Sequence, residues 1–233
     1  MLHRNLALSF ALFAAAALLG AAFVLRERRA RSPMIDLGLF SRSAFSAGVA
    51  SGLLSYLVLF GALFVTPFFL ESDRGLSPGT TGALLTALPI AIGLVAPLAG
   101  RAADSLGARP LTVAGMGVAA AALALLALAH GTTPLVGGWL ALLGVGLGLF
   151  TPANNAAIMG AAPPAQSGMA SGVLNMTRGL GTSLGLSLTG LVFAIYTGTH
   201  ADPTLVAEGF TAACWLLAAA ALAALRGRAA NPV

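Results

Sequence analysis

Seven long apolar runs constrain this chain more than any other feature of its sequence. Each holds roughly 20 mostly apolar residues, the length that an α-helix needs to cross about 30 Å of hydrocarbon. A membrane β-barrel would instead show short segments of alternating polarity, and these runs are continuously apolar. The sequence therefore predicts an all-α membrane protein with about seven transmembrane helices, at 6–25, 44–70, 80–100, 110–129, 135–159, 167–196 and 206–225.

The composition excludes an ordinary soluble domain. Only 8% of the residues are charged and 58% are hydrophobic, whereas soluble domains carry about 25% charged residues. The expected partner is therefore the lipid bilayer, because lipid tails accept the apolar side chains that water would not. The net charge of +5 comes from arginines between the apolar runs, so we expect no nucleic acid partner. With Cys214 as the one cysteine, no multi-cysteine metal site is possible, and no metal or cofactor is expected.

The arginines between the runs predict the orientation in the cell membrane. One side of the membrane would have only Arg4 and Arg74, the other side would have nine arginines, and Arg178 falls inside a run. By the positive-inside rule the side with nine arginines is cytoplasmic, which places the amino terminus outside and the carboxyl terminus inside. A cleaved signal peptide over residues 1–23 is the alternative, but its apolar core is longer than usual. The nine arginines of the cytoplasmic side are Arg26, Arg28, Arg29, Arg31, Arg42, Arg101, Arg109, Arg226 and Arg228.

Three segments resemble the major facilitator superfamily, in family order and at family spacing. Residues 59–82, LFGALFVTPFFLESDRGLSPGTTG, resemble the start of the carboxyl half of such a transporter. Residues 100–110, GRAADSLGARP, resemble its cytoplasmic loop motif. Residues 171–185, SGVLNMTRGLGTSLG, resemble a segment of the fourteen-helix drug/proton antiporters of the EmrB/QacA type. The resemblance covers about residues 5–226.

The resemblance implies a fold, a domain organisation and a function. Six helices would form a half-bundle of two inverted three-helix repeats. Residues 1–43 would be a linker-like helix with an Arg-rich cytoplasmic loop, 44–226 the carboxyl-terminal transporter half and 227–233 a cytoplasmic tail. The chain would not be an enzyme but part of a multidrug exporter that moves a small amphipathic substrate by alternating access, together with a separate amino-terminal half. The alternative is a truncated remnant or membrane assembly partner that does not transport.

The loop motif consists of Gly100, Arg101, Asp104, Gly107 and Arg109. Gly107 suits the left-handed backbone conformation that ends a helix. Asp104 is expected to accept from backbone donors or to pair with Arg101 or Arg109. The resemblance implies that this loop latches one conformational state, and the alternative is a plain helical hairpin with good caps.

A polar stripe follows one face of the sixth run. Its members are spaced by 4, 3, 4 and 7 residues, which keeps them on one side of a helix. Such a stripe should face the bundle interior or a cavity rather than lipid. Its one charge, Arg178, is a candidate for the substrate path with Asn175 and Thr182, unless the guanidinium reaches the headgroups instead. The stripe is Ser171, Asn175, Arg178, Thr182 and Thr189.

Three further residues complete the candidates for the substrate path. Asn154 and Asn155 follow Pro152, so their amides either satisfy the carbonyl that the proline frees or line the path. Tyr56 lies beside Ser51 and Ser55, for which packing is the simpler interpretation.

Glycine spacing and carboxylate positions give the remaining expectations. The GxxxG spacing predicts close helix packing. The string around Ser183, GTSLG, also fits a serine hydrolase elbow, which needs a preceding strand and a His partner, and no His lies within a run. All acidic residues are expected at run ends or in loops, so the chain alone does not supply the buried carboxylate that proton coupling usually needs. The four glycine pairs are Gly48 and Gly52, Gly144 and Gly148, Gly168 and Gly172, and Gly181 and Gly185.

Overall fold

The computed structural model describes residues 15, 18–22, 25–26, 37–128, 133–198 and 202–230. The first expected span, 6–25, lies largely outside these residues. The chain divides into two compact units, Met1–Arg42 and Ser43–Val233. Within the described part of the first unit, a short 3₁₀-helix, η1, covers Leu37–Ser41. Residues 15, 18–22 and 25–26 of this unit are also helical, and the helices from α2 onward belong to the second unit.

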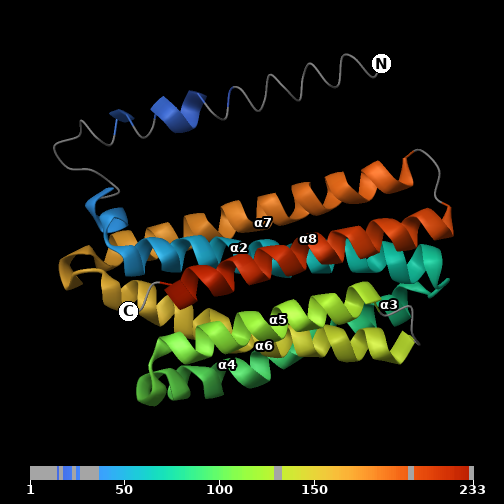
Figure 1. The fold of residues 1–233 in the computed structure, drawn as a ribbon, viewed down its shortest axis with the longest axis horizontal. Helices are drawn as coiled ribbons and strands as arrows, with labels where there is room; N and C mark the ends of the chain where they lie inside the picture. Colours follow the sequence, from blue (N-terminus) through green and yellow to red (C-terminus); the bar gives the residue numbers. More distant parts are fainter. Residues whose placement is uncertain are drawn as a thin grey trace. The chain divides into compact units, whose positions relative to one another are not determined.

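The second unit contains six apolar segments long enough to cross a membrane among its described residues. They follow the six expected spans from 44 to 225, which confirms the predicted all-α membrane fold (Figure 1). The last helix continues to Ala230, five residues past its expected end. The helices are α2 (Ser43–Phe68) with the π-helical turn η2 (Phe69–Asp73), α3 (Pro78–Leu85) with α4 (Ala87–Leu106), α5 (Ala108–Leu128), α6 (Thr133–Ala161), the 3₁₀-turn η3 (Pro164–Gln166), α7 (Ser167–Thr197) and α8 (Pro203–Ala230).

The helix contacts of the first three spans, α2 to α5, mirror those of the last three, α6 to α8. Helix α4 packs on α6 as α7 packs on α2, and α5 packs on α6 as α8 packs on α2. All four contacts join one three-helix repeat to the other, as do those of α5 with α8 and of α2 with α6. Because α2 and α6 run in opposite directions (Figure 1), this is the arrangement of two inverted three-helix repeats.

The core lies between α2, α5, α6 and α8. Large apolar side chains such as Val58, Leu123 and Phe150 are fully buried in it. Glycines bring α5 and α6 together, because a Cβ on Gly115 would lie 2.6 Å from the carbonyl oxygen of Gly146. Such an approach replaces side-chain contacts with backbone contacts and favours tight packing in a bilayer, where apolar burial alone drives helices together weakly.

Three of the four predicted glycine pairs lie at helix contacts. Gly48 and Gly52 face α6, Gly144 and Gly148 face α4, and Gly181 and Gly185 face α2. The prediction was wrong for Gly168 and Gly172, where an added Cβ would meet no atom within 4 Å. These two glycines lie on the side of α7 that this unit leaves uncovered.

The RGLSP string forms the turn between η2 and α3. The Arg74 guanidinium pairs with Asp73, with 3.1 Å between Nε and Oδ2, and lies over the Phe69 ring. Gly75 has a φ of 65°, a conformation that glycine adopts without steric cost. Ser77 then caps α3 by accepting from the Thr80 backbone N–H, and Pro78 occupies the first turn, where its missing N–H costs nothing.

Candidate functional site

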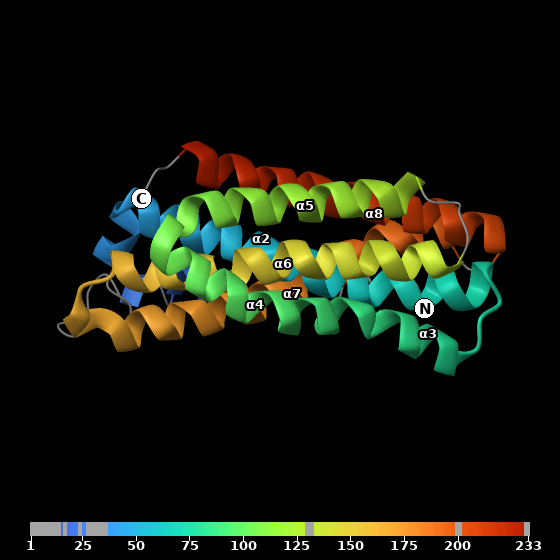
Figure 2. The same ribbon diagram turned by 90° about the horizontal axis from the view of Figure 1, so that it is seen from below.

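Two helices of the second unit leave one broad face open. In the α3–α4 segment and in α7, only 17% of the most apolar stretch is buried, against 44% to 50% in the other four spans. Figure 2 shows α4 and α7 along one side of the bundle, with α5 and α8 along the other. We call the surface carried by α4 and α7 the open face. It contains the polar stripe of α7.

The stripe lies beside the packed side of α7 rather than inside this bundle. Ser171, Asn175 and Arg178 are exposed, and Thr182 is half-buried. Only Thr189 is fully buried, and it belongs to the small-residue face that packs on α2. Within this unit the three exposed residues therefore do not face the bundle interior, and the alternative, that they face a cavity, stays a prediction.

The structure brings two of the predicted residues together: Arg178 is exposed on the open face, and Tyr56 of α2 is buried beside it. The Arg178 Nη2 donates to the Tyr56 hydroxyl at 3.2 Å, and the guanidinium carbon lies 5.3 Å from the centroid of the Tyr56 ring. Arg178 is eleven residues into α7, about 17 Å from its start. The cation is therefore held near the middle of the span by an aromatic ring from α2, a favourable contact for a partly desolvated guanidinium.

Asn154 serves the packing of the bundle instead of the open face. Its side chain is fully buried, and its Nδ2 donates to the carbonyl oxygen of Gly48 in α2 at 3.1 Å. Its Oδ1 accepts from Nε of Arg228 at 3.0 Å and also from Nη2. Helices α2, α6 and α8 are thus joined at one end by a single amide.

Sequence reasoning missed the role of Arg228. It was expected in a tail, yet only 2% of its surface is exposed. The signal was present in the spacing, because Leu217, Ala221, Ala224 and Arg228 follow one another by 4, 3 and 4 residues and are all buried. That helical period continues past the last apolar residue of the span.

Asn175 and Asn155 are the remaining candidates for the substrate path to be placed. Asn175 donates to the carbonyl oxygen of Ser171 in its own helix at 3.2 Å, and Asn155 is half-buried. Ser51 and Ser55 are buried and donate to carbonyls of α2 itself, as the packing interpretation predicts.

The loop motif forms a tight reversal between α4 and α5. Gly107 ends α4 with a φ of 81°, and Gly100 is half-buried. Arg109 Nη2 donates to the carbonyl oxygen of Ala229 at 2.7 Å, so it satisfies a free carbonyl at the end of α8. Within the described residues Asp104 forms no ion pair with Arg101 or Arg109, so the second of its two expected interactions is not formed.

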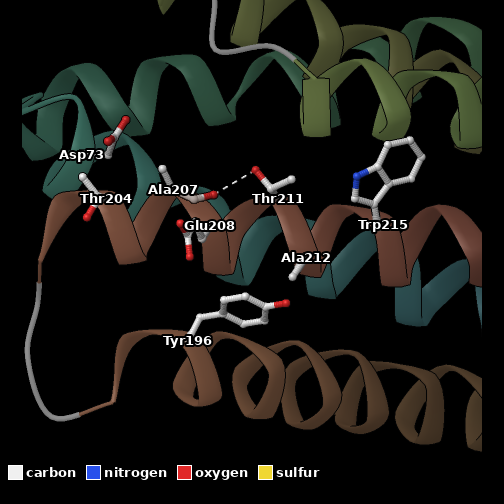
Figure 3. Close-up of a pocket in the computed structure, with 8 residues that line it drawn as sticks. All are labelled: Asp73, Tyr196, Thr204, Ala207, Glu208, Thr211, Ala212 and Trp215. Atoms are coloured by element: carbon white, nitrogen blue, oxygen red, sulfur yellow. Dashed lines mark hydrogen bonds between the residues drawn. The ribbon is translucent and has the colours of Figure 1, made fainter.

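A cavity of about 560 Å³ lies at the opposite end of the bundle. It follows one side of α8 and is bounded by Asp73 of η2 and Tyr196 of α7 (Figure 3). Glu208 lies in the second turn of α8, and Trp215 lies further along the same helix. The other lining residues are Thr204, Ala207, Thr211 and Ala212.

Two further features concern a carboxyl group at this end of the bundle and metal binding. Asp202 accepts from the backbone N–H and the hydroxyl of Thr204, which holds the pKa of that carboxyl below its ordinary value. Over the residues that the structure describes, no group of three or more His, Cys, Asp or Glu side chains is placed to hold a metal ion.

Comparison with known proteins gives a consistent family. The profile of the Major Facilitator Superfamily matches residues 48–231. Multidrug resistance protein Stp of Mycobacterium tuberculosis is 33% identical over 187 residues, which are 79% of this chain and 35% of that protein. Riboflavin transporter RibZ of Clostridioides difficile is 33% identical over 73% of this chain and 38% of its own length. Multidrug efflux pump LfrA of Mycolicibacterium smegmatis is 32% identical over 82% and 38%. The chain thus spans little more than a third of these relatives.

Proposed function

The chain belongs to the major facilitator superfamily, and on that premise we propose that it supplies the carboxyl-terminal half of a multidrug exporter of the fourteen-helix drug/proton antiporter branch. As a member of a transporter family it is a multi-pass membrane protein and not an enzyme, which replaces the hydrolase interpretation of Ser183. Two of the three relatives above carry multidrug resistance or efflux in their names. In this proposal, residues 1–43 are the linker helix and its loop.

The open face is the observation that carries this proposal. Alternating access needs two bundles that move against each other around a site between them. Helices α4 and α7 occupy equivalent positions in the two inverted repeats, and both are mostly uncovered. A second bundle seated on this face would cover both at once, so we assign the face to an amino-terminal half.

Arg178 and Tyr56 are the residues of this half that we place on the substrate path. With a second bundle present, the guanidinium would lie between the two halves, near the middle of the membrane, where a charge is costly unless it has a function. Asn175 and Thr182 lie one turn to either side along α7. They would offer hydrogen bonds to a small amphipathic substrate.

Proton coupling is assigned to the partner half. Helices α2 and α7 contain no Asp or Glu, and α4 contains only Asp104 near its end. The carboxylate that exchanges protons near the membrane centre must then come from the other bundle.

The orientation follows from the charges at the two ends. Arg101, Arg109, Arg226 and Arg228 gather where α4, α5 and α8 meet. We propose that this end is cytoplasmic, in the cell membrane, as the positive-inside rule requires.

Reconstitution tests the proposal directly. The chain would be expressed alone and with a matching amino-terminal half, and efflux of ethidium from energised vesicles would be measured with and without a protonophore. We expect protonophore-sensitive efflux only when both halves are present, and Arg178→Ala in this chain should reduce it. Efflux by the purified chain alone would overturn the proposal. Absence of efflux with a half that demonstrably binds the chain would favour the remnant or assembly partner.

A further inference from the structure

A groove of about 380 Å³ lies between α2 and α8, at the arginine-rich end of the bundle. Helix α2 contributes one face, from Ser43 to Leu54. Helix α8 contributes its last turns, at Ala223, Ala224 and Gly227, and Figure 1 shows the start of α2 beside the end of α8. We propose that this groove binds one anionic phospholipid, with the lipid phosphate at the Ser43 end. This inference concerns a lipid bound to this chain and does not depend on transport.

The charge that calls for an anion is that of Arg228. The side chain is 2% exposed, and its guanidinium donates to a neutral group, the Asn154 amide. No carboxylate pairs with it among the described residues. Helices α2, α6 and α8 surround it and carry one acidic residue, Glu208, which lies near the opposite end of α8. A buried charge without a counter-charge is costly, so an anion bound nearby would stabilise this end of the bundle.

The groove is close enough to Arg228 to hold that anion. A Cβ on Gly48 would lie 3.2 Å from Nη2 of Arg228. Ala47, the residue before Gly48, and Ser51, nearly one turn after it, both line the groove. The α2 backbone therefore separates the guanidinium from the occupant. Because the attraction between charges is stronger in a protein interior than in water, it acts on a phosphate that does not touch the arginine.

The start of α2 favours an anion at the same place. Helix α2 begins at Ser43 and has no acidic residue in its first turn, so the positive end of its dipole lies at this end of the groove. The Ser43 hydroxyl is exposed there and lines the groove. Phosphate oxygens accept hydrogen bonds from such groups at helix starts. Charge and hydrogen bonding thus both place the phosphate at Ser43.

The length and lining of the groove favour a lipid over a free anion. From Ser43 to Leu54 the groove follows α2 for about 16 Å, at 1.5 Å per residue. Past the serines its walls are apolar, and small side chains such as those of Ala50 and Ala223 leave room for an acyl chain. A phosphate at Ser43 would lie at the level of the headgroups, with the chain directed toward the middle of the membrane. Basic pockets between transmembrane helices bind anionic headgroups in this way.

Native mass spectrometry of the full chain in detergent tests the assignment. The two probes are dioleoyl phosphatidylglycerol and dioleoyl phosphatidylcholine, which have the same acyl chains and differ in headgroup charge. We expect one phosphatidylglycerol to bind saturably at concentrations where phosphatidylcholine does not. Arg228→Gln should weaken the apparent affinity about fivefold, the scale of one arginine near a membrane surface. Arg228→Lys keeps the charge and should retain most of the affinity.

A second variant tests the groove without touching the charge. Ala223→Phe places a ring in the groove from an exposed position and leaves Arg228 on Asn154, so it should weaken phosphatidylglycerol binding as well. Two matched controls should leave the affinity unchanged. Arg226→Gln removes an exposed charge from the same turn of α8, and Ala121→Phe adds a ring at an exposed position of α5 that does not line the groove.

Four outcomes would overturn the proposal. Equal losses from Arg226→Gln and Arg228→Gln would show a general surface attraction. Unchanged binding to the Ala223→Phe protein would place the lipid elsewhere. Equal binding of the two lipids would mean that the headgroup charge has no part in it. Displacement of phosphatidylglycerol by glycerol phosphate would mean that the site holds a free anion and not a lipid.

Discussion

Arg228, two residues before the last described residue, donates two hydrogen bonds to the side-chain oxygen of Asn154, 74 residues earlier in the sequence. The same amide donates onward to the backbone of Gly48. Three helices that begin far apart in the chain are therefore fixed to one another at one end of the bundle.

The first prediction follows from this contact. Asn154→Ala should lower the free energy of unfolding by about 2–3 kcal/mol, because the buried guanidinium loses its acceptor. Combining it with Arg228→Met should restore part of the loss, since no unpaired buried charge then remains. Denaturant unfolding of the four proteins gives the coupling free energy. Arg226→Ala, at an exposed position of the same helix, should change little, and additive effects of the pair would contradict the contact.

The second prediction concerns the glycines of α7. A Cβ at Gly185 would lie 2.5 Å from the carbonyl oxygen of Leu57, so Gly185→Ala should separate α2 from α7 and cost about 1–3 kcal/mol. Gly172 lies in the same helix and has nothing within 4 Å. Gly172→Ala should therefore be neutral or stabilise by up to about 1 kcal/mol through helix propensity. Thermal unfolding in detergent compares the two, and the reverse ranking would contradict the α2–α7 packing.

The third prediction separates the two contacts of Tyr56. In a reconstituted transporter, Arg178→Ala should reduce efflux more than Ser183→Ala, which alters an exposed hydroxyl of the same helix. Tyr56→Phe keeps the ring below the guanidinium and removes only the hydroxyl acceptor, a loss of about 0.5–1.5 kcal/mol. Its efflux should fall between those of the two other variants. Indistinguishable rates for all three would mean that Arg178 only reaches the headgroups.

The fourth prediction tests the orientation. Cys214 is buried, so an introduced cysteine is the reactive one in the membrane. A membrane-impermeant maleimide added outside intact cells should label Ser72→Cys and leave Ser105→Cys unlabelled until the cells are opened. Both positions are exposed, at opposite ends of the bundle. The opposite pattern would invert the topology and refute the assignment of the arginine-rich end.

The fifth prediction uses the cap of α8. Thr204 holds the pKa of Asp202 below 3.8, so the ionised carboxylate stabilises the fold above pH 3.8, and this contribution is lost as the pH falls through the lower folded value. Asp202→Ala should lower the melting temperature at neutral pH, and the difference should shrink in acid. Asp202→Asn keeps a capping acceptor and should remove the pH dependence alone. A difference that is constant from pH 7 to pH 3 would contradict the ionised cap.

The sequence predicted the six spans because hydropathy reports directly on contact with lipid. The sequence does not predict in the same way which helices pack together. Gly168 and Gly172 have the spacing of a packing motif but lie on an uncovered side of α7. Spacing identifies a helix face and not the neighbour that covers it. Asn154 and Arg178 were both recognised as unusual polar residues, yet only the folded chain distinguishes a packing amide from a cation on the open face.

Arg228 was missed for a related reason. A hydropathy window ends a span where charges begin, whereas the helix continues for another turn and buries one of those charges. The Tyr56–Arg178 contact spans 122 residues, and no local pattern encodes it. Such pairs become visible only when α2 and α7 are placed side by side.

The two ends of the bundle also differ electrically. Arg101, Arg109, Arg226 and Arg228 stand against Asp104 at one end, while Glu71, Asp73, Asp202 and Glu208 stand against Arg74 at the other. Across a membrane that is negative inside, each elementary charge differs by about 2.3 kcal/mol per 100 mV between the two surfaces. The membrane potential thus favours one orientation of the unit over the reverse. In a cell that is depolarised while the protein inserts, this contribution to the orientation of the unit would be smaller.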